Sequence, residues 1–174
     1  VGTVNEYQRY PFTWKKVSQQ FEKLKKITLE KQDYRINLSH TLTTLNMLTL
    51  PNLLIWWENQ IKEANSSGVD YIITSLPHIQ CVNQPQTLDP IYMPKQMKED
   101  CRFILSNFEN GLNNELKTKY KPALDNIRTN VLDVEVDDAK QKEVWNKMKT
   151  YLKSLDDYRN KNVFNYLPYM EKYW

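Results

Sequence analysis

The segment YRINLSHTLT, residues 34–43, alternates between two kinds of side chain along its whole length. Large and mostly apolar side chains stand at Tyr34, Ile36, Leu38, His40 and Leu42. Polar and mostly short side chains stand between them, at Arg35, Asn37, Ser39, Thr41 and Thr43. Successive side chains of a β-strand point to opposite faces of the sheet. The segment therefore predicts a strand with one apolar and one polar face.

A helix and a second strand follow this segment. Residues 50–64 carry the signals of a helix, because Thr49 and Pro51 stand at its start and NSSG (65–68) follows its end. The run VDYIITSL, residues 69–76, is apolar on both faces, as in a sheet that helices cover. A strand, a helix and a strand in about forty residues predict a βαβ unit with parallel strands.

The pattern on either side of this unit indicates half of a larger α/β domain. An amphipathic helix predicted at 14–28 precedes the first strand, so the chain begins inside an alternating pattern whose preceding strand is missing. Two strands do not make an independently stable sheet. We predict an α/β part in residues 1–93 and a helical extension in residues 94–174. The segment 77–94 carries four prolines and is predicted to be a long loop that faces a substrate.

Composition excludes several classes of protein. The 24 basic and 21 acidic residues leave a formal charge of only +3, which argues against a dedicated nucleic-acid binder. No stretch approaches the ~20 apolar residues of a membrane span. The two cysteines, Cys81 and Cys101, fit a reducing compartment, so we expect a cytoplasmic protein. No G-x-G-x-x-G or Walker motif occurs, which removes the usual phosphate loops.

The segment NEYQRYPFTW, residues 5–14, places four aromatic residues around Arg9, namely Tyr7, Tyr10, Phe12 and Trp14. It is interpreted as a packing corner, as a stacking surface for nucleic acid, or as a cradle that aims Arg9 at an anionic ligand. The low net charge disfavours the stacking surface. A planar guanidinium suits a carboxylate, which favours the cradle. Packing alone, with Arg9 paired to Glu6 or another neighbour, stays open at this stage.

The polar face of the first strand is the second candidate for chemistry. In βα-barrels and open α/β sheets, ligands bind at the carboxyl ends of the strands. Thr41 and Thr43 stand nearest that end. The alternative interpretation is an edge strand with one solvated face.

A metal site is the third candidate. His78 and Cys81 are spaced H-x-x-C, but zinc needs four ligands, or three and a water. Only His40 and Cys101 remain as further partners, and Cys101 is better explained as a buried small side chain. We therefore predict no metal site in this chain.

Three segments together resemble a known family. Residues 6–14 follow the pattern E-Y-I-R-Y-G-x-x-W, with Pro11 in place of glycine. Residues 41–46 follow T-V-S-x-x-N through Thr41, Thr43 and Asn46. A third pattern, D-x-x-R-N-x-N followed by a proline, is matched by Asp156, Arg159, Asn160, Asn162 and Pro168. The chain resembles the C-terminal half of radical S-adenosylmethionine (SAM) proteins with a twitch domain, a group common in phages and environmental bacteria.

The resemblance implies a fold and a parent activity. The α/β part would be the C-terminal part of a (β/α)6 partial barrel. The intact parent would use a [4Fe-4S] cluster and S-adenosylmethionine to generate a 5′-deoxyadenosyl radical. The cluster motif C-x-x-x-C-x-x-C is absent from this sequence. The chain alone is therefore expected to be inactive, to bind neither cofactor, and to have the missing N-terminal half of the barrel as its partner.

The resemblance also implies roles for individual residues. Arg9 would contact the methionine carboxylate of S-adenosylmethionine. Thr41, Thr43 and Asn46 would lie near the ribose or the substrate. Leu76 and His78, at the end of the last strand, would lie near the adenine. The alternative function is a non-catalytic module whose helical half binds a protein partner or RNA.

Overall fold

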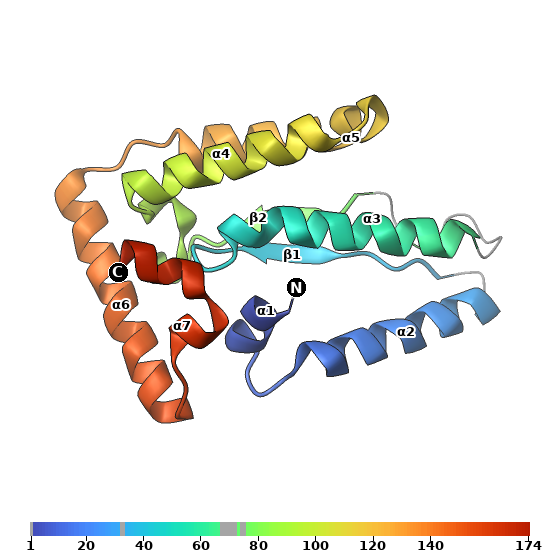
Figure 1. Ribbon diagram of the computed structural model, residues 1–174, viewed down its shortest axis with the longest axis horizontal. Helices are drawn as coiled ribbons and strands as arrows, with labels where there is room; N and C mark the ends of the chain where they lie inside the picture. Colours follow the sequence, from blue (N-terminus) through green and yellow to red (C-terminus); the bar gives the residue numbers. More distant parts are fainter. Residues whose placement is uncertain (1, 32–33, 67–72, 74–75) are drawn as a thin grey trace.

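The computed structural model describes residues 2–31, 34–66, 73 and 76–174 (Figure 1). Strand β1 (Ser39–Leu42) pairs in parallel with β2 (His78–Cys81), Ser39 lying opposite His78. Helix α3 (Leu50–Ser66) connects the two strands, and an isolated bridge between Ile36 and Ile73 extends their pairing. The predicted parallel strand–helix–strand unit is confirmed. The described residues form a mostly helical α/β protein with a two-stranded parallel sheet, and no barrel is seen among them.

The second strand lies later in the chain than the sequence indicates. We predicted it at 69–76, where 69–72, 74 and 75 fall outside the described residues. The described strand β2 covers 78–81, inside the segment that we predicted to be a loop. Backbone hydrogen bonds place the end of this pairing after Cys81, because the Val82 amide still donates to the Leu42 carbonyl at 2.9 Å. The prediction that Leu76 and His78 end the last strand was therefore wrong.

Helices α1 (Thr3–Gln8) and α2 (Trp14–Lys31) precede the sheet, which confirms the helix predicted at 14–28. A group of rings joins α2 to α3. Phe21 lies 5.2 Å from Trp56 and 6.1 Å from Trp57 between ring centroids, and Trp14 meets Trp56 edge-on at 5.3 Å. Aromatic pairs at this spacing add about 0.5–1.5 kcal/mol each beyond the area they bury. The apolar stripe of α2 is thus held against the start of α3.

The second half of the chain is helical, as predicted. It contains α4 (Lys95–Gly111), α5 (Asn114–Ile127), a π-helical turn (Arg128–Leu132), α6 (Asp138–Arg159) and α7 (Val163–Tyr166). Short 3₁₀ helices cover Met47–Thr49, Gln86–Leu88, Pro90–Tyr92 and Pro168–Tyr173. The Asp137 side chain accepts a hydrogen bond from the Lys140 amide at 3.0 Å and is the N-cap of α6.

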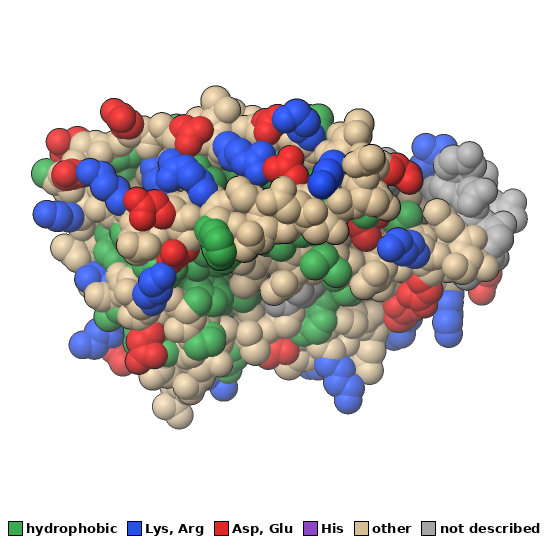
Figure 2. Space-filling model, turned by 45° about the horizontal axis from the view of Figure 1, so that its top comes forward, with side chains coloured by type: hydrophobic (Ala, Val, Ile, Leu, Met, Phe, Trp, Pro, Cys, Tyr) green, Lys and Arg blue, Asp and Glu red, His purple; other side chains and the backbone are tan. Residues whose placement is uncertain are grey.

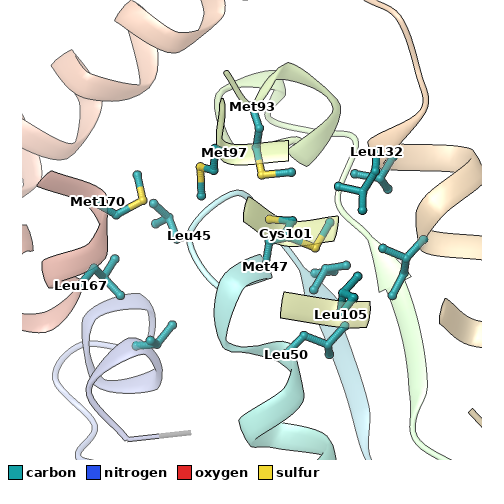
Figure 3. Close-up of a cluster of buried hydrophobic side chains, with 14 of the residues drawn as sticks. Leu45, Met47, Leu50, Met93, Met97, Cys101, Leu105, Leu132, Leu167 and Met170 are labelled. Carbon is teal, nitrogen blue, oxygen red and sulfur yellow. The ribbon is translucent and has the colours of Figure 1, made fainter. Parts of the chain in front are cut away.

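One cluster of buried side chains joins the two halves (Figure 3). Met47 comes from the 3₁₀ helix before α3, and Leu50 is the first residue of α3. Helix α4 contributes Met97, Cys101 and Leu105, and the C-terminal segment contributes Leu167 and Met170. Cys101 is 1% exposed, so it is the buried small side chain that the sequence predicts. Burying a Leu or Met side chain contributes about 1.5–3 kcal/mol. The boundary placed after residue 93 therefore runs through a shared core, and a division into two domains stays a prediction.

The surface and the helices bear on the class of protein. On the face shown in Figure 2, Lys and Arg side chains are mixed with Asp and Glu rather than gathered into one basic patch. None of the described helices combines the length and hydrophobicity that crossing a bilayer requires. The mixed surface agrees with the balanced charge of the sequence.

Candidate functional site

Tyr7 fixes helix α1 against helix α6. Its side chain is 3% exposed, and its hydroxyl donates to Asp156 Oδ1 at 2.9 Å. Burial and this hydrogen bond raise the pKa of the Tyr7 phenol. Because α6 crosses the end of the molecule toward which both strands run (Figure 1), this contact places α1 beside the carboxyl ends of β1 and β2.

The four aromatic residues around Arg9 have separate tasks. Tyr7 anchors α1, and Trp14 packs on Trp56 of α3. The Tyr10 ring lies 5.1 Å from the guanidinium of Arg159, and Phe12 is 60% exposed. The rings therefore do not form one continuous stacking surface. The packing-corner interpretation describes Tyr7 and Trp14.

Arg9 itself is not used in packing. Its side chain is exposed and has no hydrogen bond or ion pair within the described part of the chain. The neighbouring carboxylate is already engaged, because Glu6 Oε1 accepts from the Trp14 amide at 2.8 Å. Pairing of Arg9 with Glu6, which the sequence left open, does not occur here. A guanidinium with five unused N–H donors is available to a ligand.

A cavity of about 270 Å³ lies beside Arg9 at the carboxyl ends of the strands. We call it the carboxyl-end cavity. Helix α1 and the end of β1 contribute Tyr7, Gln8, Arg9, Thr41, Thr43 and Leu45, and the segment after β2 contributes Val82 and Leu88. Helix α6 closes it with Tyr151, Leu152, Leu155 and Arg159. The structure thus brings three of the predicted site residues together, and it adds Arg159, for which the sequence indicated no ligand role.

The two threonines offer hydroxyl groups to this cavity. Thr43 Oγ1 accepts from Gln8 Nε2 at 2.7 Å, so its own proton remains free to donate. The hydroxyl of Thr41 has no partner within the described ranges. Both stand where ligands bind parallel α/β sheets.

Asn46 has a structural task instead. Its Oδ1 accepts from the Thr43 amide at 2.8 Å, and its Nδ2 donates to the Thr41 carbonyl at 3.0 Å and to Gln8 Oε1 at 3.3 Å. The carboxamide therefore stands in for a neighbouring peptide group at the open edge of β1. Asn46 is 4% exposed and does not line the carboxyl-end cavity.

Leu76 and His78 are not brought to the site. Leu76 is 45% exposed, and His78 is the exposed first residue of β2, opposite Ser39. Neither lines the carboxyl-end cavity. The cause is the later position of β2, which puts Val82, and not Leu76, at the strand's end.

A second cavity of about 440 Å³ runs along the other edge of β1. We call it the edge cavity. Consecutive residues 36–40 line it from the strand, while Trp14, Phe21 and Trp56 line it from α2 and α3. The amide of His78 donates to the Leu38 carbonyl at 2.7 Å, so even-numbered residues of β1 face β2. The backbone of Ser39 faces the edge cavity, and none of the described residues bonds to it.

Two buried polar atoms in the edge cavity have no hydrogen-bond partner among the residues that the structure describes. They are Nε2 of His40 and Oδ1 of Asn5. Burial, aided by the nearby Arg9 guanidinium, lowers the pKa of His40 to about 4, so the imidazole is neutral at pH 7. Sequence reasoning missed both atoms, because an apolar strand face gave no sign that a ring nitrogen would stay unpaired.

The cysteines and His78 do not combine into a metal centre. Residues three apart on a strand point to opposite faces, so His78 and Cys81 diverge. Cys81 is exposed, while burial raises the pKa of the Cys101 thiol to about 12. No group of three or more metal-ligating side chains occurs in the ranges that the structure describes.

Comparisons of the chain with protein-family models, with curated proteins and with solved structures found no match. The function therefore has to be argued from the cavities and the side chains that line them. Of these, the carboxyl-end cavity gathers the residues that the sequence singled out.

Proposed function

We propose that this chain forms the C-terminal part of a radical SAM enzyme, where it supplies the wall on the cofactor and substrate side. The observation that carries the proposal is the free guanidinium of Arg9 at the carboxyl-end cavity. The parent would hold S-adenosylmethionine and a [4Fe-4S] cluster, which together supply a 5′-deoxyadenosyl radical. The chemistry belongs to the cofactors, and the task of this chain is to bind and orient.

The residues of the cavity suit the amino-acid end of S-adenosylmethionine. A guanidinium fork matches a carboxylate in shape and charge. Thr41 and Thr43 add two hydroxyl donors on the same side. Charge-assisted hydrogen bonds of this kind contribute about 1.5–3 kcal/mol each. Arg9, Thr41 and Thr43 are therefore the residues that would hold this end of the cofactor.

The chain does not fit the cluster. A [4Fe-4S] cluster needs three or four thiolates held together. Cys81 is exposed on β2 and Cys101 is 1% exposed in the core. The cluster ligands would have to come from the missing N-terminal half of the barrel, which is the partner that we propose.

The open edge of β1 supports such a partner. An unpaired strand edge is a place where another strand adds, and proteins rarely leave one uncovered. Here the Ser39 backbone faces the apolar edge cavity. A preceding parallel strand would pair with this edge and bring the half-barrel together.

Because residues 1–174 alone are expected not to hold the cofactor stably, the test looks for weak, transient contact at high S-adenosylmethionine concentration, read from amide chemical shifts in NMR spectra. We expect shifts at Thr41 and Thr43, and at least a tenfold weaker affinity in Arg9→Gln. Arg35→Gln is the matched control, since Arg35 is also exposed and without a described partner but lines neither cavity. An Arg9→Gln chain that binds as the wild type does would remove Arg9 from the site.

A further inference from the structure

Arg159 is the last residue of α6. It lines the carboxyl-end cavity, as Arg9 does from the other end of the sequence. Its Nη1 donates to the Tyr7 carbonyl at 2.9 Å. Its guanidinium lies 5.9 Å from the centroid of the Tyr7 ring and 5.1 Å from that of Tyr10. These contacts restrict its rotamers and use only one of its five N–H donors.

The positive charge of Arg159 is not neutralised by an ion pair. Asp156 precedes Arg159 by three residues on α6, and each of its oxygens already accepts a hydrogen bond. Oδ1 accepts from the Tyr7 hydroxyl at 2.9 Å, and Oδ2 accepts from the Val163 amide at 2.7 Å. No salt bridge to Arg159 occurs among the described residues.

The carboxyl-end cavity therefore has an unusual charge balance. Arg9 and Arg159 both line this cavity of about 270 Å³, Arg9 lines the edge cavity as well, and no Asp or Glu is among the lining residues of the carboxyl-end cavity. Like charges that line one cavity repel each other, and an anion between them relieves the repulsion. Arginine also provides the fork geometry that carboxylate and phosphate groups match.

We propose that Arg159 and Arg9 together bind one anionic group, a carboxylate or a phosphate, in the carboxyl-end cavity. Arg9 approaches it from the segment between α1 and α2, and Arg159 approaches it from α6. Tyr7 and Tyr10 are neighbours of Arg9 in the sequence, but their rings contact Arg159 and hold its guanidinium in place. Tyr7 thereby couples the helix that carries the first arginine to the helix that carries the second.

The anion has two possible sources, the carboxylate of S-adenosylmethionine and a phosphate of the molecule acted upon. The inference deepens the proposed function and rests on its assignment of Arg9 to an anion. It does not depend on radical chemistry, so a binding measurement tests it alone.

The experiment titrates residues 1–174 with S-adenosylmethionine and, separately, with inorganic pyrophosphate, and reads amide shifts around Thr43. We expect Arg159→Gln to weaken at least one probe tenfold or more, with Arg35→Gln unchanged. If Arg159→Gln weakens the binding of both probes, the anion is assigned to the cofactor carboxylate. If it weakens the binding of pyrophosphate alone, the anion is assigned to a phosphate on the substrate.

Arg159→Lys is the variant that separates a binding defect from a folding defect. Lysine keeps the positive charge near the Tyr7 and Tyr10 rings and loses only the planar guanidinium that can bond an anion through two N–H groups. We expect a several-fold weaker affinity for the same probe and a wild-type circular dichroism spectrum. Wild-type affinity for both probes in a folded Arg159 variant overturns the inference, as does a wild-type chain that binds neither probe. If Arg9→Gln alone weakens binding, the proposed function stands and this inference fails. If neither arginine matters, both fail.

Discussion

At the scale of single residues, the structure separates groups that the sequence places side by side. Arg9 and Glu6 are close in sequence, yet Glu6 caps the Trp14 amide and leaves Arg9 free. His40 stands on the apolar face of its strand, yet its Nε2 is buried without a partner. A buried ring nitrogen without a partner costs free energy, whereas the exposed guanidinium of Arg9 is solvated and open to a ligand. These residues mark the two cavities.

His40 makes the stability of the protein depend on pH. Its pKa in the folded chain, about 4, lies below the ordinary value of 6.5, so the neutral ring is the form that folding favours. This contribution is present above pH 6.5 and is lost as the pH falls toward 4. We expect the free energy of unfolding to drop by about 2 kcal/mol between pH 7 and pH 4.5 on account of this residue.

Urea titrations at pH 7 and pH 4.5 measure this effect. In His40→Leu, the free energy of unfolding should fall by about 2 kcal/mol less than in the wild type between pH 7 and pH 4.5. His78→Leu, at an exposed position on the neighbouring strand, should show the same fall as the wild type. A His40→Leu chain that loses as much stability in acid as the wild type would contradict the assignment.

At the scale of elements, the edge of β1 shows how a strand ends beside a cavity. The amide side chain of Asn46 bonds to the Thr41 carbonyl and to the Thr43 amide, where a neighbouring strand would otherwise bond. It stops strand pairing at this end of the edge. The backbone of Ser39, earlier in the strand, stays open.

Asn46→Ala should therefore destabilise the protein more than an ordinary polar substitution does. It leaves the Thr41 carbonyl and the Thr43 amide without partners, at about 1–3 kcal/mol for each group that stays buried. We expect a loss of about 2–4 kcal/mol in urea unfolding. The control is Asn37→Ala, an exposed asparagine on the same segment without a described partner, which should change stability by less than about 0.5 kcal/mol. Equal effects of the two substitutions would show that the amide does not cap the edge.

The elements show what sequence reasoning can and cannot supply. Periodicity located α2, and start and end signals located α3, because an apolar stripe and helix-terminal residues are local properties of the chain. The same reasoning missed the position of β2, since HIQC at 78–81 has no strand pattern of its own and becomes a strand only by pairing with β1. Thr41, Thr43 and Arg9 could be proposed as candidates because a strand's alternation and an arginine flanked by aromatic residues are visible in the sequence. Arg159 was missed because α6 meets α1 only in three dimensions.

At the scale of the whole molecule, one core joins the α/β part to the helical extension. Leu45, in the loop after β1, packs in the same buried cluster as Leu167 and Met170 of the C-terminal segment (Figure 3). Helix α6 lies across the carboxyl ends of the strands (Figure 1). The helical extension is thus positioned to complete the cavity that the strands begin. The open edge of β1 is where the proposed N-terminal half would join.

The measurement that tests the central claim most directly is the sequence of the coding DNA upstream of the Val1 codon. The account predicts an in-frame extension that encodes C-x-x-x-C-x-x-C on a loop after a strand, which would supply the cluster ligands that this chain lacks. A stop codon close upstream, followed by a start codon at or just before Val1, would contradict it. The carboxyl-end cavity would then belong to a protein without a radical SAM cluster.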